Sequence, residues 1–246
     1  MIKPALIAGA ALAALTLSAC ESTQDKAAKV RAEGDKFLND RHGLRITAVN
    51  KDVKVLDKTI LSDKNGTAVV VELENRGKVD EAQVPIGIQL ADASGKKVFA
   101  NDTPGLEAAL VSMPLLPRGK AEVWVHNQIL PTGKPKTLDV KVGVAPKVVV
   151  PAKPPHITLS SIKTDHDSDG AFVTGVVHNR SDVEQRRLTI FCVARKGGRI
   201  VAAGRAVVEK LPVGEPKKPI RFTVYFIGNP AGATLDFSVP PVALKG

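Results

Sequence analysis

The sequence predicts an all-β protein built from two similar antiparallel domains. Residues 66–76 read G-T-A-V-V-V-E-L-E-N-R, and Val69, Val71 and Leu73 alternate with their neighbours at the period of a half-buried strand. The pattern returns 104 residues later, at 170–180, as G-A-F-V-T-G-V-V-H-N-R. No long stretch with a helical period accompanies it, which disfavours a parallel α/β sheet.

The first twenty residues have the pattern of a targeting segment. Lys3 precedes an apolar run, residues 5–16, that is too short to span a bilayer. The run ends in Leu-Ser-Ala-Cys at 17–20, which resembles the lipobox of bacterial lipoprotein precursors. The resemblance implies cleavage of a signal peptide, residues 1–19, and acylation of Cys20, which would make the membrane a partner through an N-terminal lipid. The alternative is a plain secretory peptide with a chance cysteine.

The localisation that this signal predicts is the cell envelope. Glu21, rather than Asp, comes after the cysteine, and this favours the periplasmic face of the outer membrane if the host is Gram-negative. Residues 20–43 then form a charged tether that we expect to be partly helical or disordered.

The first sandwich domain is predicted at 44–143. After the strand at 69–73, a second alternation places Val84, Ile86, Ile88 and Leu90 on one face. A turn at 92–95 and a Leu-Pro-Arg-Gly turn at 116–119 separate further strands, and 121–125 and 137–142 complete the unit.

Residues 144–155 contain a run of prolines and predict a stiff linker before the second domain, 156–246. With a shift of 104, the alternating residues 188–194 fall on 84–90. After small gaps, the Leu-Pro-Val-Gly turn at 211–214 and the segment 234–237 match 116–119 and 137–140. We interpret this order as an internal duplication, and each copy has the size of an immunoglobulin-like sandwich.

Strand and turn order also resembles the small extracytoplasmic domains of the FxLYD and CARDB type. The resemblance covers 59–142 and 157–239, and Asn75 and Asn179 match the asparagine that ends the central strand of those families. The aromatic-Leu-Tyr-Asp element itself is absent from 88–92 and 192–195. Such domains are adhesion or scaffold modules, so the resemblance implies a non-catalytic role.

The charge balance suggests a second type of partner. The 246 residues carry a formal net charge of +10, and the second domain is the more basic one. This excess suits an anionic lipid headgroup or cell-wall polymer, with Arg186, Arg187, Lys217 and Lys218 as the candidate surface. A solvated face that promotes solubility explains the same residues. Because the chain is exported, nucleic acid is not an expected partner.

One motif is typical of calcium loops. Residues 165–170 read D-H-D-S-D-G, so Asp165, Asp167 and Asp169 are weak candidate ligands. The twelfth position of an EF-hand loop would be Val176 rather than Glu. The equivalent first-domain stretch, Asp-Lys-Asn-Gly at 63–66, favours a tight hairpin turn in both copies.

No residue pattern predicts catalysis or a cofactor. The histidines lack metal-ligand spacing, no serine lies in a nucleophile motif, and Glu72 and Glu74 are interpreted as solvent-facing. Cys192, at an inward strand position, is expected to be buried, and Trp124 to anchor the core or an edge. We therefore expect a non-enzymatic interaction or scaffold module for another envelope protein, or alternatively a binding protein for lipid headgroups, lipopolysaccharide or cell-wall polymer.

Overall fold

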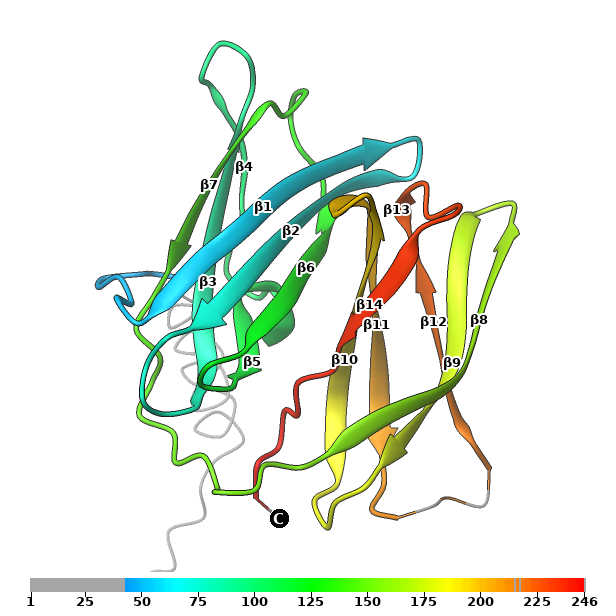
Figure 1. Ribbon diagram of the computed structural model, residues 1–246. Helices are drawn as coiled ribbons and strands as arrows, with labels where there is room; N and C mark the ends of the chain where they lie inside the picture. The colour runs from blue at the N-terminus through cyan, green and yellow to red at the C-terminus, as the bar shows by residue number, and fades with distance from the viewer. Residues whose placement is uncertain (1–42, 215, 217, 246) are drawn as a thin grey trace, which may run out of the picture. The chain divides into compact units, whose positions relative to one another are not determined.

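A computed structural model of the chain describes residues 43–214, 216 and 218–245 (Figure 1). These residues belong to one compact unit. The predicted signal peptide, all but the last residue of the tether, Cys20 and Lys217 lie outside the described residues. Within the part that the structure describes, no helix is long and apolar enough to cross a membrane.

Residues 53–142, the first half, form two facing antiparallel sheets. One sheet has the order β1-β2-β6, and in the other β3 pairs with β4, β5 and β7. Because β3 leaves the first sheet and β6 returns to it, the chain crosses between the layers as in Greek-key sandwiches. The elements are β1 (Val53–Asp63), β2 (Gly66–Asn75), β3 (Glu81–Ala91), β4 (Lys97–Ala100), the 3-10 helix η1 (Ala108–Leu110), β5 (Ser112–Leu116), β6 (Ala121–Ile129) and β7 (Thr137–Val142).

Residues 157–238, the second half, repeat this plan. The sheet β12-β9-β8 corresponds to β6-β2-β1, and the sheet β13-β11-β10-β14 contains β10 in the place of β3. The elements are β8 (Ile157–Asp167), β9 (Gly170–Asn179), β10 (Gln185–Lys196), β11 (Arg199–Leu211), β12 (Ile220–Tyr225), β13 (Ile227–Gly228) and β14 (Thr234–Ser238). The predicted all-β sandwich class is confirmed.

The register repeats as well. β1 and β2 pair from Val53↔Asn75 to Asp63↔Gly66, and β8 and β9 pair from Ile157↔Asn179 to Asp167↔Gly170, at positions 104 residues on. Both hairpins therefore close through the tight turns that the sequence predicts. Duplication as the origin of this likeness stays a prediction.

The two asparagines that end β2 and β9 have the same structural role. The Asn75 Nδ2 donates to the Val79 and Leu116 carbonyl oxygens, at 2.9 and 3.0 Å, and its Oδ1 accepts from the Gly77 N–H. The Asn179 amide makes the corresponding bonds to backbone groups 104 or 96 residues further along. Both side chains are buried, so each satisfies backbone groups that would otherwise lack partners at the strand exit.

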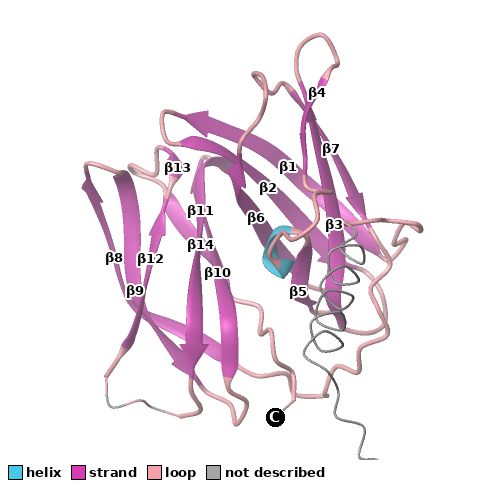
Figure 2. Cartoon of the chain, turned by 180° about the vertical axis from the view of Figure 1, so that it is seen from behind, coloured by secondary structure: helices cyan, strands magenta, loops and turns pink. Residues whose placement is uncertain are grey.

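The halves differ where β3 and β10 meet their neighbours. β10 pairs with one long strand, β11, whereas β3 pairs with two short ones, β4 and β5, separated by the loop 101–111. Buried Asn101 holds this loop: its Nδ2 donates to the Ile86 and Leu110 carbonyls, and its Oδ1 accepts from the Ile88 N–H. Figure 2 shows η1 in this loop, beside β5 and β6.

The two halves pack directly on each other through the outer faces of two sheets. Val70 on β2 lies on the strand face that was expected to be exposed from Glu72 and Glu74, yet it is fully buried. Phe191 and Val193 on β10 join the apolar core of the first half. The sheets β1-β2-β6 and β13-β11-β10-β14 are thus buried on both faces, and the four sheets form four layers (Figure 1). The sequence did not predict this contact across the linker.

Two predictions about single residues are confirmed. Cys192 is buried in the apolar core of the second half, together with Leu188 and Ile190. Trp124 is fully buried in the first half, and its indole Nε1 donates to the Ala109 carbonyl at 2.8 Å. The indole therefore fixes the loop that carries η1 to β6.

Candidate functional site

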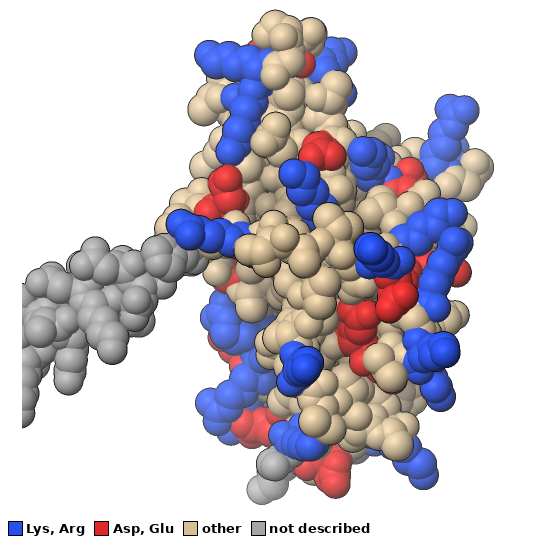
Figure 3. Space-filling model, turned by 90° about the vertical axis from the view of Figure 1, so that its left-hand side faces the viewer, with Lys and Arg blue, Asp and Glu red and all other residues tan. Residues whose placement is uncertain are grey.

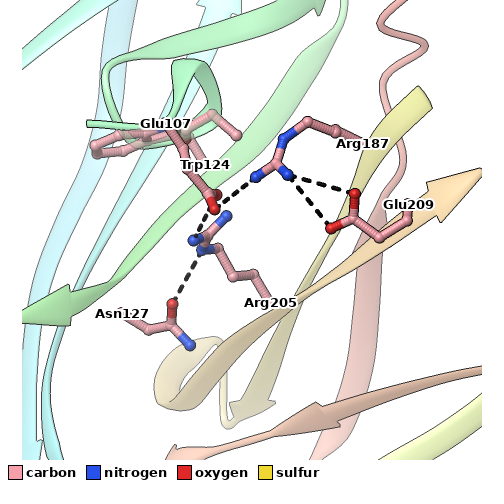
Figure 4. A network of polar contacts seen from close by, with 7 residues as sticks. Glu107, Trp124, Asn127, Arg187, Arg205 and Glu209 are labelled. Carbon is pink, nitrogen blue, oxygen red and sulfur yellow. Dashed lines mark hydrogen bonds and ion pairs between the residues drawn. The ribbon is translucent and has the colours of Figure 1, made fainter. Parts of the chain in front are cut away.

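The loop 101–111 brings a carboxylate to the second half. Glu107, just before η1, reaches two arginines with its two oxygens (Figure 4). Its Oε1 lies 2.7 Å from Nη2 of Arg187 on β10, and its Oε2 lies 3.0 Å from Nη2 of Arg205 on β11. Arg187 also contacts Glu209 at 3.3 Å. One carboxylate therefore ties two strands of the second half to the first.

Arg205 is the buried member of this network. Only 3% of its side chain is exposed, and its Nε donates to Oδ1 of Asn127 on β6 at 3.1 Å. Its Nη1 is buried with no hydrogen-bond partner among the described residues. A buried guanidinium is costly unless it is paired, so Glu107 and Asn127 are needed to keep this charge in the junction.

A neutral histidine lies next to this charge. His126 on β6 is fully buried, and its ring contacts Phe99 and Trp124 edge-on. Burial, and secondly the positive charge of Arg205, lower the pKa of His126 to about 4. The imidazole is therefore uncharged near neutral pH, and neither ring nitrogen has a described partner.

Three further polar contacts join the halves around the apolar junction. Arg195 lies 2.9 Å from Glu72, so this carboxylate, expected on a solvent face, is part-buried in an ion pair. The Ser238 hydroxyl donates to Glu122 at 2.6 Å; burial nevertheless raises the pKa of Glu122. The Gly228 N–H donates to Asp63 at 2.8 Å. Polar groups thus surround an apolar centre, as in protein interfaces.

A cavity of about 360 Å³ opens beside the Glu107 network. It lies within the size range of small-molecule and side-chain pockets. Apolar groups from both halves line it, and Glu107 and Arg187 supply charge. The other lining residues are Gln83, Ala108, Ala109, Ser112, Pro114, Arg186, Thr189, Val207 and Val242.

A second cavity of about 340 Å³ adjoins the first, because Gln83, Pro114 and Val242 line both. We call the two together the junction groove. Val242 is held there by the buried Gln185 side chain, whose Oε1 accepts from the N–H groups of Val242 and Ala243 at 2.9 and 3.0 Å. The C-terminal segment is therefore a fixed wall of the groove.

The four candidate anion-binding residues are not brought together as free charges. Arg186 pairs with Glu184 at 2.9 Å, and Arg187 pairs with Glu107 and Glu209. Lys218 is exposed, and Lys217 lies outside the described residues. The two arginines are held by three carboxylates, two of which also pair with Arg205 and Lys210, so this is an ion-pair network rather than a cluster of unpaired positive charges.

The candidate calcium loop is a hairpin turn between β8 and β9. The Asp167 Oδ1 accepts from the N–H groups of Asp169 and Gly170, and its Oδ2 accepts from the Tyr225 hydroxyl at 2.9 Å. The Tyr225 bond contributes most to lowering the pKa of Asp167. Both oxygens of this carboxylate are therefore occupied by protein donors. No group of three or more His, Cys, Asp or Glu side chains suited to a metal ion is found in the described residues.

Cys192 and the groove residue Ser112 do not have the surroundings of activated nucleophiles. Burial raises the pKa of the Cys192 thiol far above its ordinary value, so the thiolate is not accessible. Ser112 in the groove donates its hydroxyl to the Ala108 carbonyl rather than to a base. What the groove can do chemically is bind apolar groups beside paired charges.

Glu107, Asn127 and Arg205 were missed by the sequence reasoning. A signal for Glu107 was present in the spacing of the two copies. The matching strands of the two halves are 104 residues apart, but the Leu-Pro turns at 116 and 211 are only 95 residues apart. The nine-residue difference marks extra chain in the first half, and this is the loop 101–111. Its partners lie on distant strands and leave no local pattern.

We predict that Glu107→Ala lowers the free energy of unfolding by about 3 kcal/mol, because it leaves Arg205 buried without its carboxylate. The matched control is Glu209→Ala, whose carboxylate is 72% exposed and contributes less than about 1 kcal/mol. Urea unfolding measures both. Equal losses in the two variants would contradict the structural role of the buried pair.

We also predict a pH dependence from His126. Its pKa is about 4 in the folded protein and close to 6.5 when unfolded, so the unfolded state binds the proton first as pH falls. Stability from this group is complete above pH ~6.5 and decreases by about 3 kcal/mol as pH falls to ~4. His126→Phe should lack that decrease, so the free energy of unfolding of the wild type minus that of the variant should fall by about 3 kcal/mol between pH 7 and 4. A difference that stays flat from pH 7 to 4 would refute the assignment.

Comparisons with known proteins give no relative from which a function can be transferred. No protein-family model, curated protein or solved structure matches the chain. The resemblance to FxLYD and CARDB domains stays a prediction, and the argument for function rests on the junction groove.

Proposed function

We propose that the protein is a lipid-anchored, non-catalytic component of the cell envelope that binds an extended segment of another envelope protein in the junction groove. The observation that carries this proposal is the pair of adjoining cavities, about 360 and 340 Å³. The first lies between the two halves, and the second lies between the first half, the linker and the C-terminal segment. Acylation of Cys20 would supply the anchor, and the fold would supply the binding surface.

The form of the groove favours an extended peptide. Side chains on one face of a strand recur every two residues, about 6.6–7 Å apart, so one segment can place alternate side chains in two neighbouring cavities. Val207 lines the first cavity, and Val149 and Leu244 line the second, so both cavities can accept apolar side chains.

Positive charge at the edge of the groove favours an acidic residue in the bound segment. Arg186 has 71% of its side chain exposed and has one described ion-pair partner, Glu184. An acidic residue of the bound segment could pair with Arg186 without breaking the Glu107 network. We therefore expect a partner segment with apolar residues two apart and an acidic residue beside them.

The alternative function, binding of an anionic lipid headgroup or polymer by the second half, has weaker support. Arg187 is held by Glu107 and Glu209, which leaves Arg186, with its single carboxylate partner, as the more available of the two. One available arginine suits a single acidic side chain better than a polyanionic surface. Arg187 also contributes to the junction, so its reversal would disturb the fold as well as binding.

We predict that a photo-crosslinking residue at Pro114 or Val242, in the full chain and in its own host, forms an adduct with another envelope protein. The control position is Lys163, an exposed residue of β8 that lines neither cavity of the groove. Ala108→Trp, which fills the first cavity, should abolish the adduct without unfolding the chain, since Ala108 is exposed.

The same experiment separates the binding site from the anchor. With Cys20→Ser, the proposal expects a soluble protein whose groove can still crosslink when the partner is added back. Adducts that form equally well at Lys163, or that persist with Ala108→Trp, would show that the groove is not the binding site.

A further inference from the structure

One end of the first half is formed by two connected loops. Residues 92–96 join β3 to β4, and residues 130–136 join β6 to β7. The Thr132 N–H donates to the Val98 carbonyl at 3.0 Å, and the Lys136 N–H donates to the Ala91 carbonyl at 2.8 Å. The second loop is thus fixed by backbone hydrogen bonds to β3 and β4, the strands that the first loop joins. We call them the tip.

A leucine projects from the tip into solvent. Leu130 is 89% exposed, the largest exposed fraction among the large hydrophobic side chains that the structure describes. Its neighbour Ile129 is 2% exposed and anchors the end of β6 in the core. Ile129 on one side of Leu130 is buried, and Thr132 on the other side is hydrogen-bonded to Val98. The backbone on both sides of Leu130 is therefore fixed, with its side chain directed outward.

The tip is also basic. It contains Lys96, Lys134 and Lys136, all exposed, and no carboxylate among the described residues lies within ion-pair distance of these three. Lys97, next to the tip, pairs with Asp102 at 3.3 Å. In Figure 3, basic side chains stand on both sides of an uncharged apex at the top of the molecule.

The tip contains one acidic residue, which offsets part of this charge. Asp92 is directed into its own turn, where its Oδ1 accepts from the Ser94 hydroxyl and from the N–H groups of Ser94 and Lys96. These bonds, the Ser94 hydroxyl first, lower the pKa of Asp92. With Lys96, Lys134 and Lys136 against this single carboxylate, the tip has a net charge of +2.

We propose that the tip contacts the surface of a lipid bilayer that contains anionic headgroups. Leu130 would enter the boundary between headgroups and acyl chains, and the three lysines would lie at the level of the phosphates. A protruding aliphatic side chain in the same tip as three exposed lysines combines the two forces that hold peripheral proteins on membranes, apolar burial and attraction to anionic lipid.

The start of the described chain lies close enough for this contact. Gly43 lies against the backbone of Asp102, five residues from Lys97 at the edge of the tip. Five residues of extended chain span about 17 Å. The segment from Cys20 to residue 42 is long enough to span about 75 Å when extended. If the proposed anchor is correct, the tip can therefore reach the same membrane.

The expected affinity is low, and an anchor would make it sufficient. Each lysine near an anionic surface strengthens binding about fivefold, and burial of one leucine about tenfold or more. Contacts of this strength become populated when a tether raises the effective concentration of the surface. The contact would then orient the anchored protein and so determine where the junction groove faces.

The test uses the chain from residue 20 onward with Cys20→Ser, so that neither the lipid nor the apolar run at 5–16 is present, and sucrose-loaded vesicles of 70% phosphatidylcholine and 30% phosphatidylglycerol. We predict cosedimentation at millimolar lipid that is lost in 0.5 M salt and with pure phosphatidylcholine. Leu130→Ser should weaken binding roughly tenfold, and reversal of Lys96, Lys134 and Lys136 to Glu at least about a hundredfold.

A control variant carries the same number of reversals on the second half, at Lys163, Lys196 and Lys218, which are exposed. This control variant should bind the vesicles only slightly less well than the parent chain, because its net charge is lower. Leu130→Ser and the tip-lysine reversals should weaken binding in the control background as they do in the parent chain. No binding to the anionic vesicles, or equal losses in the tip and control variants, would overturn the proposal. Groove crosslinking that survives the tip variants would leave the proposed function standing, so failures of the two are distinguishable.

Discussion

The structure depends on one packing constraint: two sheets, one from each half, bury their outer faces against each other. A sandwich domain normally leaves the outer face of each sheet to solvent, and β2 and β10 do not follow this rule. Val70 from the first half and Phe191 from the second are fully buried in the junction. Removing such apolar area from water is the main favourable term in the association of two surfaces, so the halves are expected to act as one body.

Every polar contact of the junction is a consequence of that packing. Because the sheets meet face to face, Arg205 on β11 is buried and requires Glu107 and Asn127. The loop that supplies Glu107 is the part in which the first half departs from the second, and it also forms one wall of the junction groove. The difference between the halves, rather than their likeness, therefore creates the candidate binding site.

The sequence predicted what depends on local pattern. Alternation and tight turns identified the strands, and the repeat correctly placed Cys192 in the core and explained the acidic run at 165–170 as a turn. The junction was not predicted, since it depends on distant surfaces. A signal was present: residues 68–71 and 190–194 are continuous apolar runs, which are typical of strands buried on both faces. Arg186 and Arg187 were identified as basic, but their carboxylate partners could not be read from the sequence, because Glu107 lies 80 residues from Arg187.

The central claim, that the two halves form one cooperative body, can be measured with two probes that the chain already contains. Trp124, the only tryptophan, reports on the first half, and in a Cys20→Ser chain Cys192 is the only thiol and reports on the second. Fluorescence of the tryptophan and reactivity of the thiol would be followed through the same urea series. The account predicts one midpoint for both probes. Two separate midpoints, with one half still folded after the other has unfolded, would contradict it.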